Sequence, residues 1–367
     1  MYNHSSTFSC KGGPYALPYL WSALQAADRP IVIYGMGNGA EKVLDACAEH
    51  SIPIAGIFAS DDFVRYQSFR GFTVKRYADL IEELGEGFII LIAFSAFTDE
   101  LLARIHTLCE THTVYAPDFD VFTSRYPAPD FAESHAQDLE KAFALLSDAR
   151  SKDVFRILTD YKATGLALPF FDAHDGRAES IRELLQLHDH ERYLDLGAYR
   201  GDTVAEFLEA TEGRFDSIDA FEPDPKNRQK LTEYVASLPH TGIGIYGAAV
   251  SDRKDMLTFT GKGGRASHLA DEGYNIPAVA IDDLHLAPTY VKMDVEGAER
   301  AALLGMWETL RRHRPKLLVS LYHHIEDYIT LPLLIDELTG GGYKYHLRMH
   351  PYIPAWDVML YAVPEEE

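Results

Sequence analysis

Short runs of apolar residues alternate with stretches of helical periodicity along most of the chain. In the first half, Ile31–Tyr34 and Phe88–Ala93 are apolar at consecutive positions, which is typical of parallel strands buried on both faces. A helix is expected over Glu41–His50, a further strand over Ile52–Phe58 and a short helix over Leu80–Leu84. This alternation predicts a small α/β domain with a parallel sheet.

The second half repeats the alternation over a longer stretch. The expected strands are Arg192–Leu196, Ser217–Phe221, Ile243–Val250, Tyr290–Met293 and Lys316–Leu321. The expected helices are Thr203–Glu212, Pro225–Leu238, Ala298–His313 and Leu333–Leu338. Two last strands, Tyr343–Met349 and Asp357–Val363, are separated by too few residues for a crossover helix. They therefore predict an antiparallel hairpin that closes an otherwise parallel sheet.

The composition changes between the two halves. From Pro117 to Pro129 the chain is rich in proline, aspartate and aromatic residues, and Ala132–Tyr161 has helical spacing. We therefore expect an N-terminal Rossmann-like domain at residues 1–125, a helical connector at 126–165 and a second Rossmann-like domain at 166–367.

Charge and cysteine content exclude several classes of protein. The 367 residues carry a formal net charge of −22, which argues against general binding to nucleic acid or an anionic membrane. The one basic run, Arg311–Arg314, is expected to end a helix and complement its dipole. Three widely spaced cysteines, a polar N-terminus and the absence of a long apolar stretch predict a cytoplasmic protein without a membrane span.

Polar residues stand where the expected strands of the second half end. They are Asp195, Glu222, Ser251 with Asp252, Asp294, and Tyr322 with His323. In open α/β sheets, ligands bind outside the carboxyl ends of the strands, where the strand order reverses. The sequence therefore predicts a binding site at this edge of the sheet.

The segment Asp195–Thr203 narrows the class of ligand. Gly197 and Gly201 allow a tight turn and a close approach of backbone to ligand, without the G-x-G-x-x-G spacing that holds a pyrophosphate. Asp195 and Asp202 would repel a pyrophosphate but suit a ligand with an ammonium and a sulfonium group. Glu222, 25 residues beyond Gly197, stands where a carboxylate can accept both hydroxyls of a ribose.

An ordered set of motifs resembles the FkbM-type methyltransferases. The motifs are YLDLGAYRGDT (193–203), FEPDP (221–225), AVSD (249–252), VKMDVEGAE (291–299) and YH (322–323), and the resemblance covers about Leu168–Ala362. It implies a Rossmann-like sheet with an antiparallel last strand, S-adenosylmethionine as methyl donor, and a hydroxyl acceptor on a sugar, lipid or secondary metabolite. The resulting hypothesis is an O-methyltransferase that acts on a small-molecule or glycan acceptor, with a sugar-containing acceptor preferred.

The resemblance also assigns candidate cofactor contacts. Gly197, Ala198 and Gly201 would contact the methionine moiety, Glu222 the ribose, and Ser251 and Asp252 the region of the adenine. The neighbouring positions complete the cofactor-binding set: Asp195, Tyr199, Asp202, Thr203, Pro223 and Asp224. Asp202 and Thr203 also have the sequence of a helix cap.

Three residues are candidates for the base that activates the acceptor hydroxyl. His323 is preferred because an unperturbed imidazole titrates near neutrality, and Asp294 and Glu296 are the alternatives. The structural alternatives are a hydrogen-bonded histidine at 323 and a helix N-terminal acid at 296. No His, Asp and Glu residues have the spacing of a dedicated metal site, so metal-independent chemistry is expected. The glycine-rich segment 261–268 is a candidate loop over the acceptor, or an ordinary hairpin.

The N-terminal G-x-G-x-x-A motif leaves a second function open. Gly35, Gly37 and Ala40 could support an NAD(P)-dependent oxidoreductase, with Asp61 or Asp62 on a ribose. Alternatively this domain only packs, presents substrate or forms a homo-oligomer. A third hypothesis is a non-catalytic ligand-binding protein on a methyltransferase fold.

Overall fold

The computed structural model describes residues 18–259 and 274–365, so the candidate loop at 261–268 lies outside the described residues. The chain divides into two compact units, each built around its own sheet. The first contains residues up to Phe143, Lys152–His174 and Met349–Asp357; the second contains Ala144–Ser151, Asp175–Arg348 and residues from Val358. The segment 349–357 thus belongs to the first unit although it interrupts the C-terminal hairpin in sequence.

The first unit contains a six-stranded sheet with the order β3-β4-β2-β1-β5-β6. Its strands are β1 (Ile31–Tyr34), β2 (Gly56–Phe58), β3 (Ser68–Phe69), β4 (Phe72–Lys75), β5 (Ile89–Ile92) and β6 (Thr113–Tyr115). All pairs are parallel except β3 with β4. The fully buried β1 and β5 confirm the reading of their apolar runs as internal strands.

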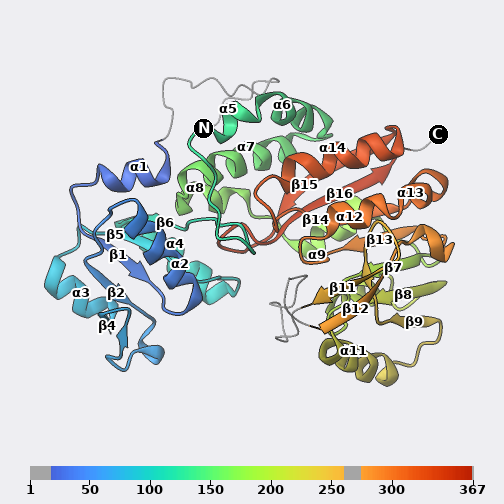
Figure 1. Cartoon of the computed structure of the whole chain (residues 1–367), viewed down its shortest axis with the longest axis horizontal. Coiled ribbons are helices and arrows are strands. Elements are labelled where there is room, and N and C mark those ends of the chain that lie inside the picture. The colour runs from blue at the N-terminus through green and yellow to red at the C-terminus, as the bar shows by residue number, and fades with distance from the viewer. Residues whose placement is uncertain (1–17, 260–273, 366–367) are drawn as a thin grey trace. The chain divides into compact units, whose positions relative to one another are not determined.

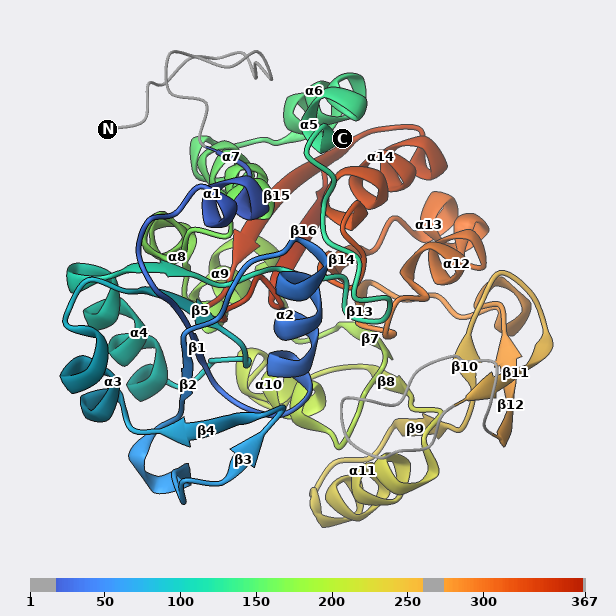
Figure 2. The ribbon, with the colours of Figure 1, turned by 60° about the vertical axis from the view of Figure 1, so that its left-hand side comes forward.

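Helices cover both faces of this sheet. The helices between residues 20 and 170 are α1 (Leu20–Gln25), α2 (Asn38–Glu49), α3 (Tyr77–Leu84), α4 (Asp99–Thr111), α5 (Phe131–Ser134), α6 (Ala136–Leu145), α7 (Ala149–Thr164) and α8 (Ala167–Phe170). Figure 2 shows α2 on one side of the strands and α3 and α4 on the other. Short helical turns follow β2 (Asp61–Phe63) and α8 (Phe171–Ala173). The unit boundaries fall within α6 and α7.

The second unit contains a seven-stranded sheet with the order β15-β16-β14-β13-β7-β8-β9 (Figure 1). Its strands are β7 (Arg192–Leu196), β8 (Ser217–Phe221), β9 (Ile243–Tyr246), β13 (Tyr290–Met293), β14 (Lys316–Ser320), β15 (Tyr343–Met349) and β16 (Val358–Pro364). Strands β7, β8, β9, β13 and β14 pair in parallel, and β16 is antiparallel to β14. The predicted α/β fold with an antiparallel terminal hairpin is confirmed.

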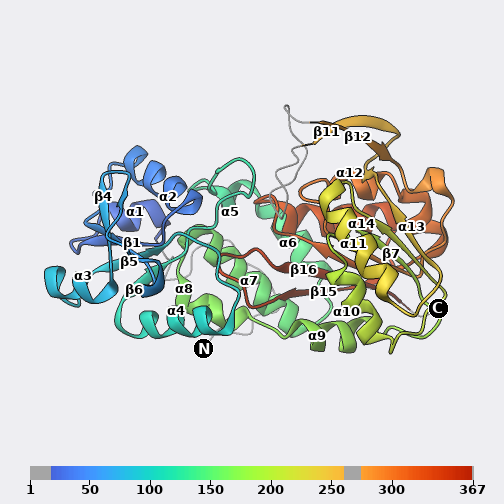
Figure 3. The same cartoon turned by 90° about the horizontal axis from the view of Figure 1, so that it is seen from below.

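Helices flank both faces of the seven-stranded sheet. They are α9 (Arg177–Ser180), α10 (Asp202–Ala210), α11 (Pro225–Ser237), α12 (Glu299–Leu304), α13 (Trp307–His313) and α14 (Asp327–Thr339), with helical turns at Ile181–Leu185 and Asp282–Leu284. Figure 3 shows α9 and α10 on one side of the sheet and α12 and α14 on the other. Buried Tyr193, Phe207 and Tyr290 stack between β7, α10 and β13.

One expected strand of the second unit is divided between two sheets. The segment Ile243–Val250 was expected as a single strand, and this expectation is wrong. Strand β9 pairs with β8 only as far as Tyr246. Residues Ala249–Val250 form β10, which joins a separate three-stranded sheet with β11 (Asp255–Phe259) and β12 (Tyr274–Val279). Apolar periodicity identifies a strand but not the partner with which it pairs, so it could not locate the change of sheet.

Two helices also differ from their expected limits. The segment Ala298–His313 was expected as one helix, but it is interrupted at Gly305, where α12 ends before α13 begins. Helix α14 runs from Asp327 to Thr339 and includes Pro332, so it is longer than the expected helix at Leu333–Leu338. Proline at this position removes one backbone donor. The helix continues nevertheless, because its many buried side chains keep it packed against its neighbours.

None of the helices within residues 18–259 and 274–365 combines the length and the apolar composition that a membrane span requires.

The break at Gly305 makes a testable prediction. A Cβ at Gly305 would lie 1.9 Å from the backbone oxygen of Ser251, so Gly305→Ala forces α12 away from the start of the small sheet. We expect a loss of about 1–3 kcal/mol in the free energy of unfolding, measured with urea. Gly87→Ala is the control, because its Cβ would meet open space among the described residues. Equal stability of the two variants would contradict this account.

Candidate active site

The strand order of the second unit reverses between β7 and β13, whose carboxyl ends lie side by side. Gly197 follows β7 and Asp294 follows β13. The two backbones approach so closely that a Cβ at Gly197 would lie 1.9 Å from the carbonyl oxygen of Asp294. Gly197 also has a φ of +94°, which favours glycine. Glycine is therefore required here by the packing of the protein itself.

The buried side chain of Lys292 supports the loop that follows β7. The Nζ of Lys292 donates a hydrogen bond to the carbonyl oxygen of Gly197 at 2.7 Å and lies 3.3 Å from Oδ1 of Asp195. The hydroxyl of Thr203 donates to Oδ2 of Asp195 at 2.5 Å. Asp195 is completely buried. The buried carboxylate of Asp195 therefore connects the start of the loop to the first turn of α10.

Burial and pairing act in opposite directions on these charges. Burial raises the pKa of Asp195 above its ordinary value, although Lys292 and Thr203 partly offset this effect. Burial alone would lower the pKa of Lys292, but the carboxylates of Asp195 and Asp294 outweigh it and raise the pKa. Lys292 therefore remains charged, and each charge depends on the other.

The turn after β7 differs in one detail from the expected helix cap. Gly201, with a φ of +97°, occupies the N-cap of α10, so the cap expected from Asp202 and Thr203 is wrong. The Thr203 hydroxyl donates to Asp195 instead, and Asp202 is an exposed acid in the first turn. Ala198 is fully buried. In this loop Arg200 and Asp202 are exposed, and Gly197 and Tyr199 are half-buried.

Glu222 lies at the end of β8 and is bound to this loop. Its Oε2 accepts a hydrogen bond from the backbone N–H of Tyr199 at 2.9 Å, and its Oε1 accepts from the N–H of Asp224 at 2.8 Å. Burial raises the pKa of Glu222 to about 7, despite these two donors. Asp224 caps α11 by accepting from the N–H groups of Lys226 and Asn227, and the adjoining Pro223 is half-buried.

The third expected cofactor segment occupies a different position. Because β9 ends at Tyr246, Ser251 and Asp252 follow β10 of the small sheet and do not end a strand of the seven-stranded sheet. The Ser251 N–H donates to the carbonyl oxygen of Val279, and Asp252 forms an exposed ion pair with Arg253. The expectation that these two residues end a strand beside Glu222 is wrong, since the chain leaves the main sheet before reaching them.

His323 follows β14 and lies among three carboxylates. Its Nδ1 is 3.0 Å from Oε1 of Glu299, and its Nε2 is 3.5 Å from both Oδ1 of Asp294 and Oε2 of Glu296. The Tyr322 hydroxyl donates to Oδ1 of Asp294 at 3.1 Å. The fold thus brings together all three candidate catalytic residues, from the ends of two neighbouring strands.

The cluster has one buried layer and one accessible layer. His323 and Glu299 are 0% and 1% exposed, whereas the side chains of Asp294 and Glu296 are 33% and 31% exposed. Burial favours a neutral imidazole, but Glu299 and Glu296 outweigh it and raise the pKa of His323 well above its ordinary value. Burial raises the pKa of Glu296, whereas Lys292 and His323 outweigh burial and lower the pKa of Asp294.

Backbone geometry sets the position of Glu296. Its φ of 54° lies in the left-handed region, which is costly for a residue with a side chain and is common at functional sites. Helix α12 begins only at Glu299, so Glu296 precedes the helix and Glu299 is its first-turn acid. Glu299 was not assigned to the site from the sequence. Glu299 stands within the quoted motif VKMDVEGAE, and its spacing of three from Glu296 was the available signal.

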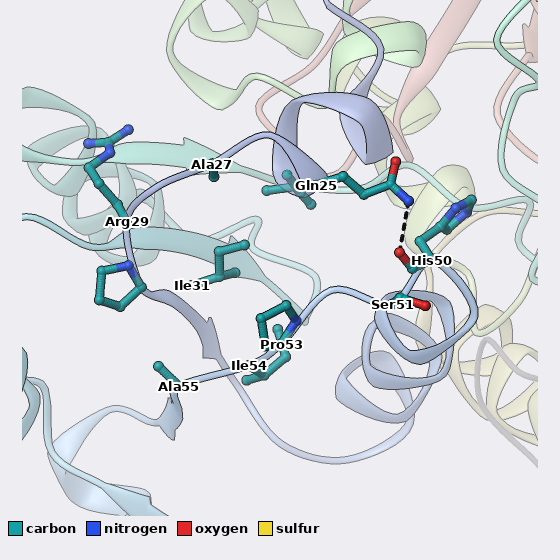
Figure 4. Close-up of a pocket in the computed structure, with 11 residues that line it drawn as sticks. Gln25, Ala27, Arg29, Ile31, His50, Ser51, Pro53, Ile54 and Ala55 are labelled. Carbon is teal, nitrogen blue, oxygen red and sulfur yellow. Dashed lines mark hydrogen bonds between the residues drawn. The ribbon is translucent and has the colours of Figure 1, made fainter.

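The glycine motif of the first unit has a clear structural role. Gly35 has a φ of +123°, and Gly37 has a φ of +103° at the N-cap of α2, so both glycines of the motif serve the turn from β1 to α2. A hollow of about 600 Å³ in this unit is lined by Pro30, Ile31 and Ala55 among others (Figure 4). It lies at the amino end of β1, whereas Gly35 follows the carboxyl end.

Comparisons with known proteins agree with the second unit's topology. Residues 195–353 match the family model described as the methyltransferase FkbM domain. The chain is similar in structure to methyltransferase FkbM from Methylobacillus flagellatus KT, with 21% identity, a TM-score of 0.69, and coverage of 91% of this chain and 89% of that chain. This similarity supports the fold. No curated protein matches the chain.

Two further solved structures have much lower similarity. An rRNA methylase from Streptococcus thermophilus has 12% identity and a TM-score of 0.34, over 52% of this chain and 94% of that chain. A fibrillarin from Aeropyrum pernix, solved with natively bound S-adenosyl-L-methionine, has 17% identity and a TM-score of 0.32, over 51% and 73% of the two chains.

The buried pair beneath the loop can be tested by stability. Lys292→Met leaves the Asp195 carboxylate buried without its ionic partner, and we expect a loss of about 3–5 kcal/mol in the free energy of unfolding. Adding Asp195→Asn removes the uncompensated charge and should restore part of this loss. The control is Lys344→Met, at an exposed position of β15, with an expected change of about 0.5 kcal/mol or less. The account fails if Lys292→Met is as stable as this control.

Proposed function

Because residues 195–353 form an FkbM methyltransferase domain, we propose that the protein is an S-adenosylmethionine-dependent O-methyltransferase that acts on a hydroxyl of a sugar-containing acceptor. One observation carries the choice of donor: the hydrogen bond from the Tyr199 N–H to Glu222, which joins the loop after β7 to the carboxylate at the end of β8. This contact joins the two predicted cofactor elements, which supports a single binding site for the donor.

The residues present suit S-adenosylmethionine. A carboxylate offers about four lone-pair sites, and Glu222 uses two of them for backbone N–H groups, so two remain for the hydroxyls of a ribose. The exposed carboxylate of Asp202 can pair with the ammonium group of the methionine moiety. The bound donor supplies a methyl group on a positively charged sulfur. The protein's task is to hold an acceptor oxygen in line with that methyl group, which is worth up to about 7–11 kcal/mol.

Glu296 is the residue best placed to accept the proton of the acceptor. Its carboxylate is accessible, whereas His323 is completely buried beneath it and cannot touch an acceptor. His323 lies 3.5 Å from both Glu296 and Asp294, and we assign it a positioning role for these two carboxylates. This assignment differs from the preference for His323 based on sequence, since burial could not be read from the sequence.

Support for a sugar-containing acceptor comes from the family and from the polarity of the rim. Asp294, Glu296 and Tyr322 are partly exposed at the ends of β13 and β14. Carboxylates and a phenol can accept and donate several hydrogen bonds at once, which suits an acceptor with several hydroxyl groups. One hydroxyl would face Glu296 while its neighbours bind Asp294 and Tyr322.

Cofactor binding should depend on pH through Glu222. Its pKa of about 7 means that the carboxyl is mostly protonated at pH 6, although ribose hydroxyls donate better to the ionised form. Isothermal titration with S-adenosylhomocysteine should give micromolar binding at pH 8 that weakens by up to about tenfold at pH 6. Glu222→Gln should weaken binding at pH 8 and remove most of this pH dependence. Binding of NAD or NADP in its place would refute the proposed donor.

Methyl transfer itself should depend on Glu296. Once an acceptor has been found by screening sugars with a labelled methyl donor, Glu296→Gln should lower kcat by about 10²–10⁴-fold, because a general base has been removed. Binding of S-adenosylhomocysteine should stay within about twofold of wild type. Glu308→Gln, on the exposed face of α13, is the matched control and should retain full activity. A Glu296→Gln enzyme with normal kcat would refute the role assigned to this residue.

A further inference from the structure

The cluster around His323 has the composition of a cation site. His323, Asp294 and Glu299 each offer one ligand atom, and the three atoms lie within 4.8 Å of one another. They come from the end of β14, the end of β13 and the first residue of α12. Two carboxylate oxygens and one imidazole nitrogen are common ligands of divalent metals such as manganese. The spacing of these three residues along the sequence, at positions 294, 299 and 323, did not indicate a common metal site.

A second observation points to a missing positive group. Glu299 is 1% exposed, and its Oε1 accepts from the Val295 N–H. Its other oxygen, Oε2, is buried and accepts no hydrogen bond from any described residue. A buried carboxylate oxygen without a donor is costly and calls for an ion or other group that has not been placed. The Glu299 carboxylate is therefore incompletely satisfied by the protein.

The charge of the cluster supports the same conclusion. Asp294, Glu296 and Glu299 surround one imidazole, which can carry at most one positive charge. The other buried cation nearby, Lys292, is engaged with Asp195 and Gly197. The cluster therefore has more negative than positive charge, and a divalent cation would offset most of that excess.

The separation of the ligand atoms also suits a metal ion. Ligands on opposite sides of a magnesium or manganese ion lie about 4.2–4.4 Å apart, so donors within 4.8 Å need to move by only a few tenths of an ångström. Asp294 is 33% exposed, which provides a path of entry from solvent. Solvent or an acceptor oxygen could occupy the remaining coordination positions on this side.

We propose that Asp294, Glu299 and His323 bind one divalent cation of the manganese or magnesium class, which binds the acceptor hydroxyl. The role in acceptor binding rests on the proposed function, whereas cation binding does not. The cation would replace the proton on the ligating nitrogen of His323 and draw electron density from the acceptor oxygen. As the new carbon–oxygen bond forms, the carbon–sulfur bond breaks and its electron pair stays on sulfur. The hydroxyl proton passes to Glu296, which is not among the three ligands. This proposal replaces the expectation of metal-independent chemistry.

The test is a titration of the full chain with Mn²⁺ after treatment with a chelator. Electron paramagnetic resonance follows the loss of the free Mn²⁺ signal. Circular dichroism of each variant checks folding, and S-adenosylhomocysteine binding is measured in parallel. Wild type should bind one Mn²⁺ per chain, and Asp294→Asn and Glu299→Gln should each weaken this binding at least about tenfold. Asp283→Asn, which alters an exposed acid outside the cluster, is the matched control and should bind as wild type.

The outcomes separate the two proposals. Absence of Mn²⁺ binding, or equal binding by Asp294→Asn, Glu299→Gln and the control, overturns the cation site even where S-adenosylhomocysteine binds normally. Binding that is lost only in the cluster variants supports the site, whether or not S-adenosylhomocysteine binds. Loss of S-adenosylhomocysteine binding in the wild type would instead count against the proposed methyl donor. If Asp294→Asn fails to fold, Glu299→Gln decides the matter, since it keeps the acceptor for the Val295 N–H.

Discussion

The close approach of the backbones after β7 and β13 is the constraint on which the rest of the site depends. The strand order reverses here, and the Gly197 carbonyl accepts from Lys292 while the Gly197 Cα faces the carbonyl oxygen of Asp294. No larger residue fits this gap. The loop toward Glu222 and the carboxylate of Asp294 therefore start from a common, tightly packed point at the carboxyl ends of β7 and β13.

Near the carboxyl ends of β7 and β13 the protein has two groups of charged residues, and the two groups have different roles. Lys292 and Asp195 neutralise each other beneath the loop and have no exposed surface to offer a ligand. In the cluster at His323, carboxylates outnumber cations, and two of those carboxylates are accessible. A balanced buried pair holds a loop in place, whereas an unbalanced cluster attracts a proton or a cation. The pair of Lys292 and Asp195 therefore supports the site, whereas the cluster at His323 supplies its chemistry.

Much of the fold followed from local patterns. The buried parallel strand Ile31–Tyr34 was expected at its observed bounds, because an uninterrupted apolar run of this length is typical of an internal parallel strand. Predictions from local patterns were wrong where a segment of the chain packs against a different element than its neighbours in sequence do. The segment Ile243–Val250 divides between two sheets, and α12 ends at Gly305 because that residue packs against Ser251. These are contacts between residues remote in sequence, which periodicity does not encode.

The sequence by itself determined which polar residues end the strands of the second unit, and therefore which side chains lie at the carboxyl edge of its sheet. Parallel strands align their carboxyl ends, so Asp195, Glu222, Asp294 and His323 had to lie along one edge. Only the tertiary structure decided which of them reach solvent. It buried Asp195 and His323, exposed Asp294 and Glu296, and recruited Glu299 from the start of α12. Burial depends on what packs above each residue, and in this site those neighbours come from other strands and helices.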